Sequence, residues 1–388
     1  MKVLFLTPRF PYPPRGGGLQ KTWAMVELLR QHVDLWLFCF HQGQQDEQWV
    51  SAWGKRLQVL PLYRGRNPLS FLASLAHGLP LSVYRNHSPA MARLVRESLQ
   101  EGFEVVIADQ LYMGHYVPPD FPGRRILHLH NVESLMWESH ARLMGVVGPL
   151  LRWEAGRLRR HELALFHRFH RLLVVCQEER KALEYLGVPG ERVTVVPNVT
   201  LPDLLRRPPL SPPQGRTVAF LGTLSWPPNE SGLRWFIGQC LPILRRLSPG
   251  VRLVVGGHNP PPWLRRAARR GEVELLAPLG QEDEERIYQR ARALVEPAWG
   301  GGGTRVKVLN ALARGLPVVT TPRGVQGLDL EPGVHVLVAH SPHEMAVALS
   351  RLMVDDQLWL RLSQAGREVV GRLYVPDVAL RPLLEALA

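Results

Sequence analysis

The sequence predicts an α/β protein built from two doubly wound domains, and three observations support this. The chain has 388 residues, which is more than one ordinary domain uses. Short apolar runs alternate with longer helical patterns twice along the chain, as in βα units on a parallel sheet. Between the two series lies a proline-rich segment, residues 197–216. It is not expected to form a helix interior or a central strand, because neither tolerates proline. We therefore expect a first domain at 1–200, a linker at 201–216 and a second domain at 217–374.

The individual elements follow from the apolar pattern. Strands are predicted at 2–7, 33–40, 57–60, 104–108, 125–130, 172–176, 193–196, 217–221, 251–255, 273–276, 293–296 and 317–320. Helices are predicted at 17–31, 90–100, 150–170, 229–247, 304–314, 343–354 and 357–373, with a short helix after Pro376. In such domains ligands bind beyond the carboxyl ends of the strands, so we expect a site in a cleft that both sheets face.

Composition narrows the class of protein. Apolar residues make up 45% and charged residues 21%, which is normal for a packed protein, and the formal net charge is +13. The basic balance predicts a polyanionic neighbour, whether nucleic acid, an anionic membrane face or a phosphorylated substrate. Cys39, Cys176 and Cys240 have neither disulfide nor zinc spacing. With no signal-peptide core and no apolar stretch of about 18 residues, we expect a cytoplasmic protein.

The strongest local motif is a glycine-rich loop between a predicted strand and a predicted helix. Four glycines, Gly300 to Gly303, precede the helix expected to open at Thr304, and Arg305 and Lys307 stand in its first turn. Glycines let the backbone approach a ligand, and a helix N-terminus presents unpaired N–H groups to an anion. Cations in a first turn oppose the helix dipole, so an ordinary loop explains them poorly. The motif predicts a diphosphate site.

Two motifs of the first half also lie where strands end. The loop at 11–18, PYPPRGGG, joins the first strand to a helix but lacks the G-x-G-x-x-G spacing of dinucleotide binding. A plain connecting loop is an equally good interpretation. His130, Asn131, Glu133 and Ser134 follow the strand predicted at 125–130. A lone histidine is usually structural, but this polar group at a strand end favours a ligand contact.

The helix predicted from Leu150 combines arginines with apolar residues. A solvated charged face is the commoner explanation, although basic amphipathic helices also dock on anionic membranes. With no nucleic-acid module in the sequence, docking at the inner face of a membrane is the preferred functional hypothesis. The arginines are Arg152, Arg157, Arg159, Arg160, Arg168 and Arg171, interleaved with Leu151, Leu158, Leu163, Leu165, Phe166 and Phe169.

These motifs together resemble the retaining glycosyltransferases of glycosyltransferase family 4, also called group 1. The resemblance lies in FLGTLSWPPN at 220–229, VVGG at 254–257, GGGTRVKVLNALA at 301–313 and GLPVVTTPRGVQGL at 315–328. Weaker matches in the first half are the glycines 16–18, HNVES at 130–134 and VPN at 196–198. The resemblance covers nearly the whole chain.

The resemblance implies a GT-B fold, in which two Rossmann-like domains face each other across a cleft. The second domain would bind a nucleotide-sugar and the first an acceptor, and the helix at about 375–388 would pack back on the first domain. Arg305, Lys307 and His130 would be catalytic, and Asn131 and Glu133 would lie on the acceptor side. Donor-binding residues would be Gly17, Gly18, Gly222, Thr223, Gly256, Gly257, Glu296, Gly301, Gly302, Gly303, Thr304, Val306 and Asn310. No metal and no cofactor is expected.

The sequence departs from the family at two places. Many members have two glutamates eight positions apart, where this chain has Gly302 and Asn310. The basic pair that many members carry after the first strand of the second domain is replaced by Thr223, Ser225 and Asn229. The diphosphate would then depend more on Arg305 and Lys307.

The predicted function is transfer of a hexose or related sugar, with retention of configuration, to a glycan, lipid-linked or other acceptor. A nucleotide-sugar epimerase of the same fold is an alternative that the Gly-rich run argues against. A non-catalytic nucleotide-sugar binder or scaffold is an alternative favoured by Asn310. A nucleic-acid-binding protein is a remote alternative based on charge alone.

Overall fold

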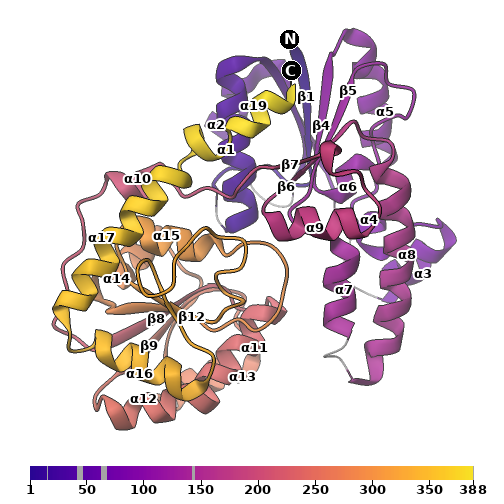
Figure 1. The fold of residues 1–388 in the computed structure, drawn as a ribbon. Coiled ribbons are helices and arrows are strands. Elements are labelled where there is room, and N and C mark those ends of the chain that lie inside the picture. Colours follow the sequence, from indigo (N-terminus) through magenta and orange to yellow (C-terminus); the bar gives the residue numbers. More distant parts are fainter. Residues whose placement is uncertain (15, 42–46, 63–67, 142–144, 388) are drawn as a thin grey trace. The chain divides into compact units, whose positions relative to one another are not determined.

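The computed structural model describes residues 1–14, 16–41, 47–62, 68–141 and 145–387 (Figure 1). It divides into two compact units. The first unit contains residues 1–197 and 379–388, and the second contains residues 198–378. The predicted linker at 201–216 therefore lies inside the second unit, where it contributes the short helix α10 (Pro202–Arg206). Arg15, in the predicted loop at 11–18, lies outside the described residues.

The first unit is built on a parallel sheet of seven strands in the order β3-β2-β1-β4-β5-β6-β7. The interior strand β1 has the sequence KVLFLT and is buried over its last five residues, as expected for a strand covered on both faces. The strands are β1 (Lys2–Thr7), β2 (Asp34–His41), β3 (Leu57–Pro61), β4 (Val105–Asp109), β5 (Arg124–His128), β6 (Arg171–Val174) and β7 (Val193–Val195).

Helices cover both faces of this sheet (Figure 1). The α-helices are α1 (Gly17–His32), α2 (Glu47–Trp53), α3 (Pro68–Ala76), α4 (Leu81–Arg85), α5 (Pro89–Ser98), α6 (Leu111–Gly114), α7 (Glu133–Ala141), α8 (Gly148–Phe166), α9 (Gln177–Tyr185) and α19 (Arg381–Leu387). Short 3₁₀ turns are η1 (Gly54–Arg56), η2 (Leu99–Glu101), η3 (Gly145–Val147) and η4 (Gly190–Arg192).

The second unit repeats the arrangement with six parallel strands in the order β10-β9-β8-β11-β12-β13. The strands are β8 (Thr217–Thr223), β9 (Arg252–His258), β10 (Glu274–Leu276), β11 (Ala293–Glu296), β12 (Val318–Thr320) and β13 (Leu337–Val338). Its further helices are α11 (Pro227–Trp235), α12 (Leu241–Leu247), α13 (Pro262–Arg269), α14 (Gln281–Arg290), α15 (Val306–Arg314), α16 (Pro342–Leu352), α17 (Asp356–Leu373) and α18 (Pro376–Ala379).

Two differences between predicted and observed helices change the description of the second unit. The helix predicted at 229–247 consists of α11, a π-helical segment at Phe236–Cys240 and α12. Pro242 stands at the start of α12, where its missing N–H prevents a regular i→i−4 bond. The helix predicted to open at Thr304 begins at Val306, so Arg305 is its N-cap residue.

The end of the described chain belongs to the first unit. Residues 379–388 are grouped with that unit, and Arg124 on β5 donates a hydrogen bond to the carbonyl oxygen of Ala386 at 3.2 Å. The tail predicted as one short helix forms two, α18 and α19. Among the described residues, no helix combines the length and the apolar character that a membrane crossing requires.

The two sheets place an acidic residue at the same topological position. In each unit the first strand has two neighbours, and one of them ends in a buried carboxylate. β4 pairs with β1 and ends at Asp109, and β11 pairs with β8 and ends at Glu296. Both side chains are fully buried. These two strand ends organise the polar groups described next.

Candidate active site

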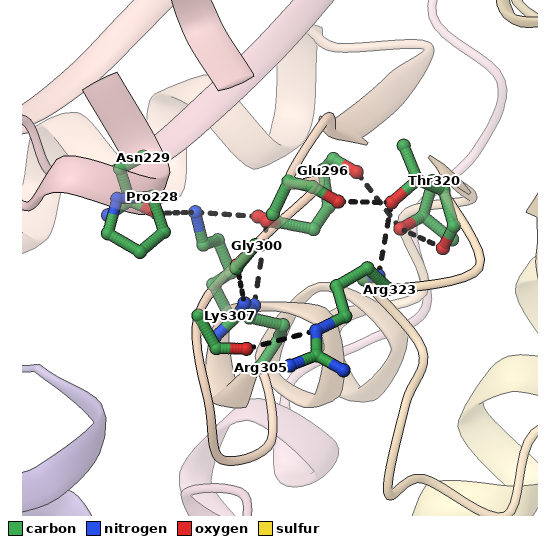
Figure 2. Close-up of polar contacts among 12 residues, drawn as sticks. Pro228, Asn229, Glu296, Gly300, Arg305, Lys307, Thr320 and Arg323 are labelled. Carbon is green, nitrogen blue, oxygen red and sulfur yellow. Dashed lines mark hydrogen bonds and ion pairs between the residues drawn. The ribbon is translucent and has the colours of Figure 1, made fainter. Parts of the chain in front are cut away.

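In the second unit, the buried carboxylate of Glu296 gathers the two predicted cations (Figure 2). Lys307 Nζ lies 2.6 Å from Glu296 Oε2, and Arg305 Nε lies 3.8 Å from Glu296 Oε1. The two cationic side chains are mostly buried, with exposed fractions of 15% and 10%. The structure therefore brings together three of the predicted site residues at one strand end.

Lys307 is held by three elements. Its ammonium group donates to Asn229 Oδ1 at 2.9 Å and lies 4.2 Å from the ring centre of Phe220 on β8. Gly222 leaves room for it, since a Cβ there would come within 3.4 Å of Nζ and 3.0 Å of the Asn229 amide. Burial lowers the pKa of Lys307, and the nearby Glu296 charge partly offsets this effect.

Arg305 closes the glycine-rich loop onto itself. Its guanidinium donates to the carbonyl oxygens of Gly302 at 3.0 Å and Gly300 at 2.6 Å. Arg323 supports the same loop by donating to Gly301 O at 3.1 Å. Gly301 has φ 93°, a conformation that a side chain would strain, and a Cβ there would clash with Pro228 at 2.8 Å. The glycines therefore shape a loop that two arginines hold.

The start of α15 retains the features of an anion site, although it lies two residues later than predicted. No acidic residue occupies its first turn, and within the described chain no side chain caps it. The N–H of Val308 already donates to Arg305 O at 2.9 Å, so the N–H groups of Val306 and Lys307 are those that a helix start leaves for an anion beside the two cations. Thr304 contacts the amide of Asn198, and Val306 is buried. Asn310, one helical turn further, accepts from the Thr200 hydroxyl at 3.2 Å.

The remaining glycines predicted to bind donor have a packing role in the structure. A Cβ at Gly257 would lie 1.8 Å from the carbonyl oxygen of Gly222, so the β8–β9 pair itself requires glycine there. A Cβ at Gly256 would collide with three aliphatic side chains, the nearest being Leu221 at 2.8 Å. Thr223 ends β8 with an exposed side chain. Contact of these residues with a donor stays a prediction.

In the first unit, His130 belongs to a buried network around Asp109. His130 Nε2 and His128 Nδ1 lie 3.0 Å and 2.8 Å from the same oxygen, Asp109 Oδ1. The hydroxyls of Thr7 and Thr22 donate to the other oxygen at 3.0 Å and 2.7 Å. Burial alone would raise the pKa of the Asp109 carboxyl, but His130 and His128 outweigh this effect and hold it below its usual range.

Gly18, which follows β1, and His130, which follows β5, lie close together although β4 separates the two strands in the sheet. A Cβ at Gly18 would lie 3.5 Å from His130 Nδ1. Gly17 is the first residue of α1, and Gly16 before it has φ 92°. α1 has no acidic residue in its first turn and, among described residues, no side-chain cap.

Glu133, predicted on the acceptor side, bonds within the first unit. It opens α7 and accepts from the Tyr112 hydroxyl at 2.9 Å. Burial raises the pKa of Glu133 to about 7, against the effect of the Tyr112 hydrogen bond. Asn131, which lies between His130 and α7 in the sequence, is half-buried. An acceptor role for both residues stays a prediction.

The histidine–aspartate group also has the composition of a metal site. The ligand atoms of Asp109, His128 and His130 lie within 4.8 Å of one another. Asp109 already accepts from four protein donors, so the group is complete as a hydrogen-bond network. The expectation that no metal takes part stays a prediction.

Sequence reasoning missed four residues that hold these sites. Arg323, Asp109, His128 and Tyr112 each make the contacts described above but carry no motif of their own. For Asp109 and His128 a signal existed, because both stand at the carboxyl ends of predicted strands, where α/β folds place ligand contacts. Arg323 and Tyr112 lie in a turn and a four-residue helix that no periodic pattern marks.

Together, the fold and the strand-end clusters define a GT-B glycosyltransferase fold. Over its full length the chain is similar to HepE (Alr3699) of Anabaena, solved with UDP and glucose, with a TM-score of 0.69 and 15% identity over 100% of this chain and 99% of that one. It is also similar to a sucrose-phosphate synthase of Thermosynechococcus elongatus, with a TM-score of 0.69, 15% identity and coverage of 99% and 97%. WaaG, a glycosyltransferase involved in lipopolysaccharide biosynthesis, gives a TM-score of 0.66 at 15% identity, with coverage of 99% and 98%. The predicted GT-B fold is confirmed.

More particularly, residues 215–355 match the family model described as glycosyl transferases group 1. The match spans the motifs from 220 to 328 and supports the predicted resemblance to group 1 glycosyltransferases over this part of the chain. A curated relative, an uncharacterized 44.6 kDa protein in the cps region of Klebsiella pneumoniae, is 24% identical over 130 residues. That match covers 32% of this chain and 33% of the relative.

Proposed function

We propose that this chain transfers a hexose or related sugar from a nucleoside-diphosphate sugar to an acceptor, with retention of configuration and without a catalytic metal. The observation that carries the proposal is the pairing of Arg305 and Lys307 with a glycine-rich loop at an uncapped helix start. The group 1 match and the HepE structures solved with UDP and UDP-glucose support a nucleotide-sugar donor.

The chemistry requires stabilisation of the leaving diphosphate. Negative charge grows on its oxygens as the bond to the sugar breaks, and preorganised donors lower that barrier. Lys307 and Arg305 provide full charges, and the first N–H groups of α15 add the partial charge of the helix start. Because both cations are already held by protein groups, little reorganisation is needed when the donor binds.

Glu296 tunes this site. Two cations facing one carboxylate leave a net charge of about +1. Without the carboxylate, burial would favour loss of the Lys307 proton, since desolvation lowers its pKa. We therefore assign Glu296 a supporting role, in which it keeps Lys307 charged and oriented, rather than direct contact with the donor.

A thermal-shift screen tests the donor assignment. The full chain is heated with UDP, GDP, ADP, TDP or CDP and with their hexose conjugates, with and without EDTA. A ligand at 100 times its dissociation constant stabilises the protein by about 2.7 kcal/mol, so one base should stand out. No shift at millimolar concentrations would contradict the proposal. A shift without transfer to any glycan or lipid-linked acceptor would favour the nucleotide-sugar-binding scaffold.

The anomeric outcome and the metal expectation are read from the product. With the preferred donor, NMR coupling constants of the new linkage distinguish retention from inversion. Equal rates with EDTA and with added Mg²⁺ are expected. An inverted product, or activity that depends on the divalent ion, contradicts that part of the proposal.

We further propose that the first unit docks on an anionic membrane, through a surface different from the predicted one. The apolar residues that were predicted on the helix from Leu150 lie largely in the core, since Leu158, Leu165, Phe166 and Phe169 are buried. The exposed apolar residues instead lie at its beginning and on α3. They are Val146, Val147, Leu150 and Trp153, together with Leu69, Leu72 and Leu75, and we call them the α3–α8 surface.

The α3–α8 surface is continuous and carries positive charge. The rings of Phe71 on α3 and Trp153 on α8 are 6.3 Å apart, and Arg157 donates from α8 to Leu79 O at 2.8 Å. Arg152 and Arg160 are exposed nearby. Residues 68–80 contain no acid, and the single acid at 145–160, Glu154, is buried in an ion pair with Arg157 at 2.7 Å. Exposed apolar groups beside arginines match an anionic lipid interface.

Vesicle sedimentation tests the membrane proposal. The full chain should bind vesicles of phosphatidylcholine with 30% phosphatidylglycerol, and binding should fall at least tenfold in Leu72→Ser/Leu150→Ser and in Arg152→Gln/Arg160→Gln. Matched controls in the second unit, Val354→Ser/Leu360→Ser and Arg361→Gln/Arg372→Gln, change exposed residues of the same kinds and should bind normally. Equal binding by all variants would remove the assignment of this surface.

A further inference from the structure

We propose that Asp109 is a positioning residue that fixes His130 as the Nε2–H tautomer, so that His130 Nδ1 accepts a hydrogen bond from a substrate hydroxyl. The identity of that substrate as a sugar rests on the proposed function. The tautomer itself rests on the geometry of the first unit.

The sheet aims both histidines at the aspartate. In the parallel pairing of β4 and β5, Asp109 lies opposite His128. His130 is two residues further along the chain, and both rings reach Asp109 Oδ1, at 2.8 Å for His128 and 3.0 Å for His130. The two rings are 4.7 Å apart between centroids. The oxygen that receives them is fully buried, so water does not compete for it.

In this arrangement the Asp109 carboxylate accepts hydrogen bonds and donates none. The hydroxyls of Thr7 and Thr22 occupy Oδ2, and the two imidazoles occupy Oδ1. An ionised carboxylate has no proton to give, so each imidazole nitrogen that faces it must carry the hydrogen. Nε2 of His130 therefore carries a hydrogen, and in the neutral form of the ring Nδ1 has the lone pair.

His130 Nδ1 lies beside Gly18, which has no side chain to cover it. A Cβ at Gly18 would stand 3.5 Å from Nδ1 and 3.6 Å from Cε1, so any larger residue there would cover this edge of the ring. The His130 side chain is 16% exposed, in contrast to fully buried His128. Within the described part of the chain, the ring makes its hydrogen bond through Nε2 and none through Nδ1.

This tautomer selects the chemistry of the ligand. A lone pair attracts a hydroxyl hydrogen and repels a phosphoryl or carboxylate oxygen. His130 would then recognise a hydroxyl group of a substrate. The residue predicted as catalytic from the motif thereby obtains a defined role as an acceptor.

His128 provides an internal reference for the measurement. It faces Asp109 through Nδ1, so it must carry its proton there, and its Nε2 is buried without a hydrogen-bond partner. Burial lowers the pKa of His128 to about 4, partly against the hydrogen bond to Asp109, so this ring is neutral at pH 7. The two histidines should therefore show opposite tautomers in one spectrum.

The experiment is long-range ¹H–¹⁵N correlation NMR on the deuterated full chain with ¹⁵N-labelled histidines, at pH 7.5. His130→Gln and His128→Gln assign the two rings. The expected result is a protonated Nε2 for His130 and a protonated Nδ1 for His128. A proton on Nδ1 of His130 overturns the proposal. The same holds if neither facing nitrogen carries a proton and EDTA restores it, because Asp109 and the histidines would then hold a metal.

Two variants separate positioning from mere stability. Asp109→Asn should mix the His130 tautomers and lower kcat/KM for transfer at least tenfold, while the affinity for the nucleoside diphosphate changes less than twofold. Thr22→Val keeps the carboxylate and should leave the tautomer unchanged and transfer within threefold. Normal kcat/KM in Asp109→Asn overturns the proposal. If Asp109→Asn does not fold, the wild-type and Thr22→Val spectra still decide the tautomer.

The spectrum also distinguishes this proposal from the proposed function. If the chain binds no nucleotide-sugar, the proposed donor is wrong but the His130 tautomer is still measured. If transfer is found and the tautomer is the opposite one, only the role of Asp109 fails.

Discussion

At the same place in their sheets, the two units surround a buried carboxylate with different partners. Asp109 and Glu296 are both fully buried at the end of the strand beside the first strand. Asp109 accepts from two imidazoles and two hydroxyls, all of which can be neutral. Glu296 instead faces an ammonium at 2.6 Å and a guanidinium at 3.8 Å.

The difference teaches what a buried carboxylate can do at a strand end. Surrounded by neutral donors, it fixes tautomers and leaves an uncharged acceptor facing outward. Surrounded by cations, it holds positive charge in a place where burial would otherwise discharge it. The first arrangement suits hydroxyl groups, and the second suits phosphates.

The largest effect should come from Arg305→Ala. It removes a donor from the anion site, and loss of one such donor lowers kcat by about 10²–10³-fold in comparable enzymes. Transfer rate with the donor found by thermal shift measures this. Arg286→Ala, which removes an exposed arginine on α14 of the same unit, is the control and should react normally. Unchanged turnover in Arg305→Ala would refute a catalytic role for the cationic cluster.

The comparison itself is tested by Glu296→Gln beside Asp109→Asn. Removing Glu296 leaves two buried cations uncompensated, which should cost about 3 kcal/mol of unfolding free energy. Asp109→Asn weakens charge-assisted hydrogen bonds and should cost a similar amount. A nucleoside diphosphate should restore stability more strongly in Glu296→Gln than in wild type, since it supplies the missing negative charge. In Asp109→Asn it should act as in wild type. Equal nucleotide responses in urea unfolding would show that the clusters do not differ in this way.

A third buried carboxylate, Glu162 on α8, has no cation or histidine described as its partner. It accepts from the Ser134 N–H at 3.2 Å, and burial raises its pKa from 4.5 to about 7 against the hydrogen bonds that Ser134 and the Glu133 backbone donate. A raised folded pKa stabilises the protein below pH 4.5, and this contribution is lost as pH rises through about 7. Glu162→Gln mimics the protonated form, so at pH 8 its free energy of unfolding should exceed that of wild type by about 2 kcal/mol.

Urea unfolding at pH 5, 6.5 and 8 measures the Glu162 effect. The difference in unfolding free energy between Glu162→Gln and wild type should shrink towards pH 5. Exposed Glu101→Gln should show no such trend. A constant difference between Glu162→Gln and wild type at all three pH values would contradict the raised pKa.

The smallest effect should come from Asn310→Ala, which lies outside both clusters. Its amide accepts from Thr200 at 3.2 Å, and an ordinary hydrogen bond is worth about 1 kcal/mol. Affinity for the nucleoside diphosphate should therefore fall less than about fivefold, by calorimetric titration. Thr200→Val, which removes the same bond from the other side, is the matched variant. A loss above fiftyfold would make Asn310 a principal donor contact.

The fold was largely predictable from the sequence because its strands are buried apolar runs. Of the strands, only β13, a pair of half-buried residues, was missed, since two residues make no periodic pattern. Helices were harder to find. α14 has the sequence QEDEERIYQR and buries only Ile287 and Tyr288, so its apolar face is too narrow to stand out. Pro242 divided one predicted helix, which the sequence could have indicated.

The candidate site was predictable where glycines and cations follow a strand, as at Arg305 and Lys307. What they would contact was not, because the partner Asn229 is 78 residues away in the chain from Lys307. Glu296 was predicted as a donor contact, yet in the structure it is engaged by the cations. To predict Asp109 as a site residue, one would need to know how β4 and β5 pair, which apolar periodicity does not specify.

The return of residues 379–388 to the first unit has a consequence for synthesis on the ribosome. The second unit is, in effect, an insertion within the first, and α19 with its Arg124 contact is made after it. The second unit can fold as soon as it emerges, whereas the first, although translated earlier, waits for α19. A chain that stalls before α19 would therefore carry a folded second unit and a first unit that lacks one of its helices.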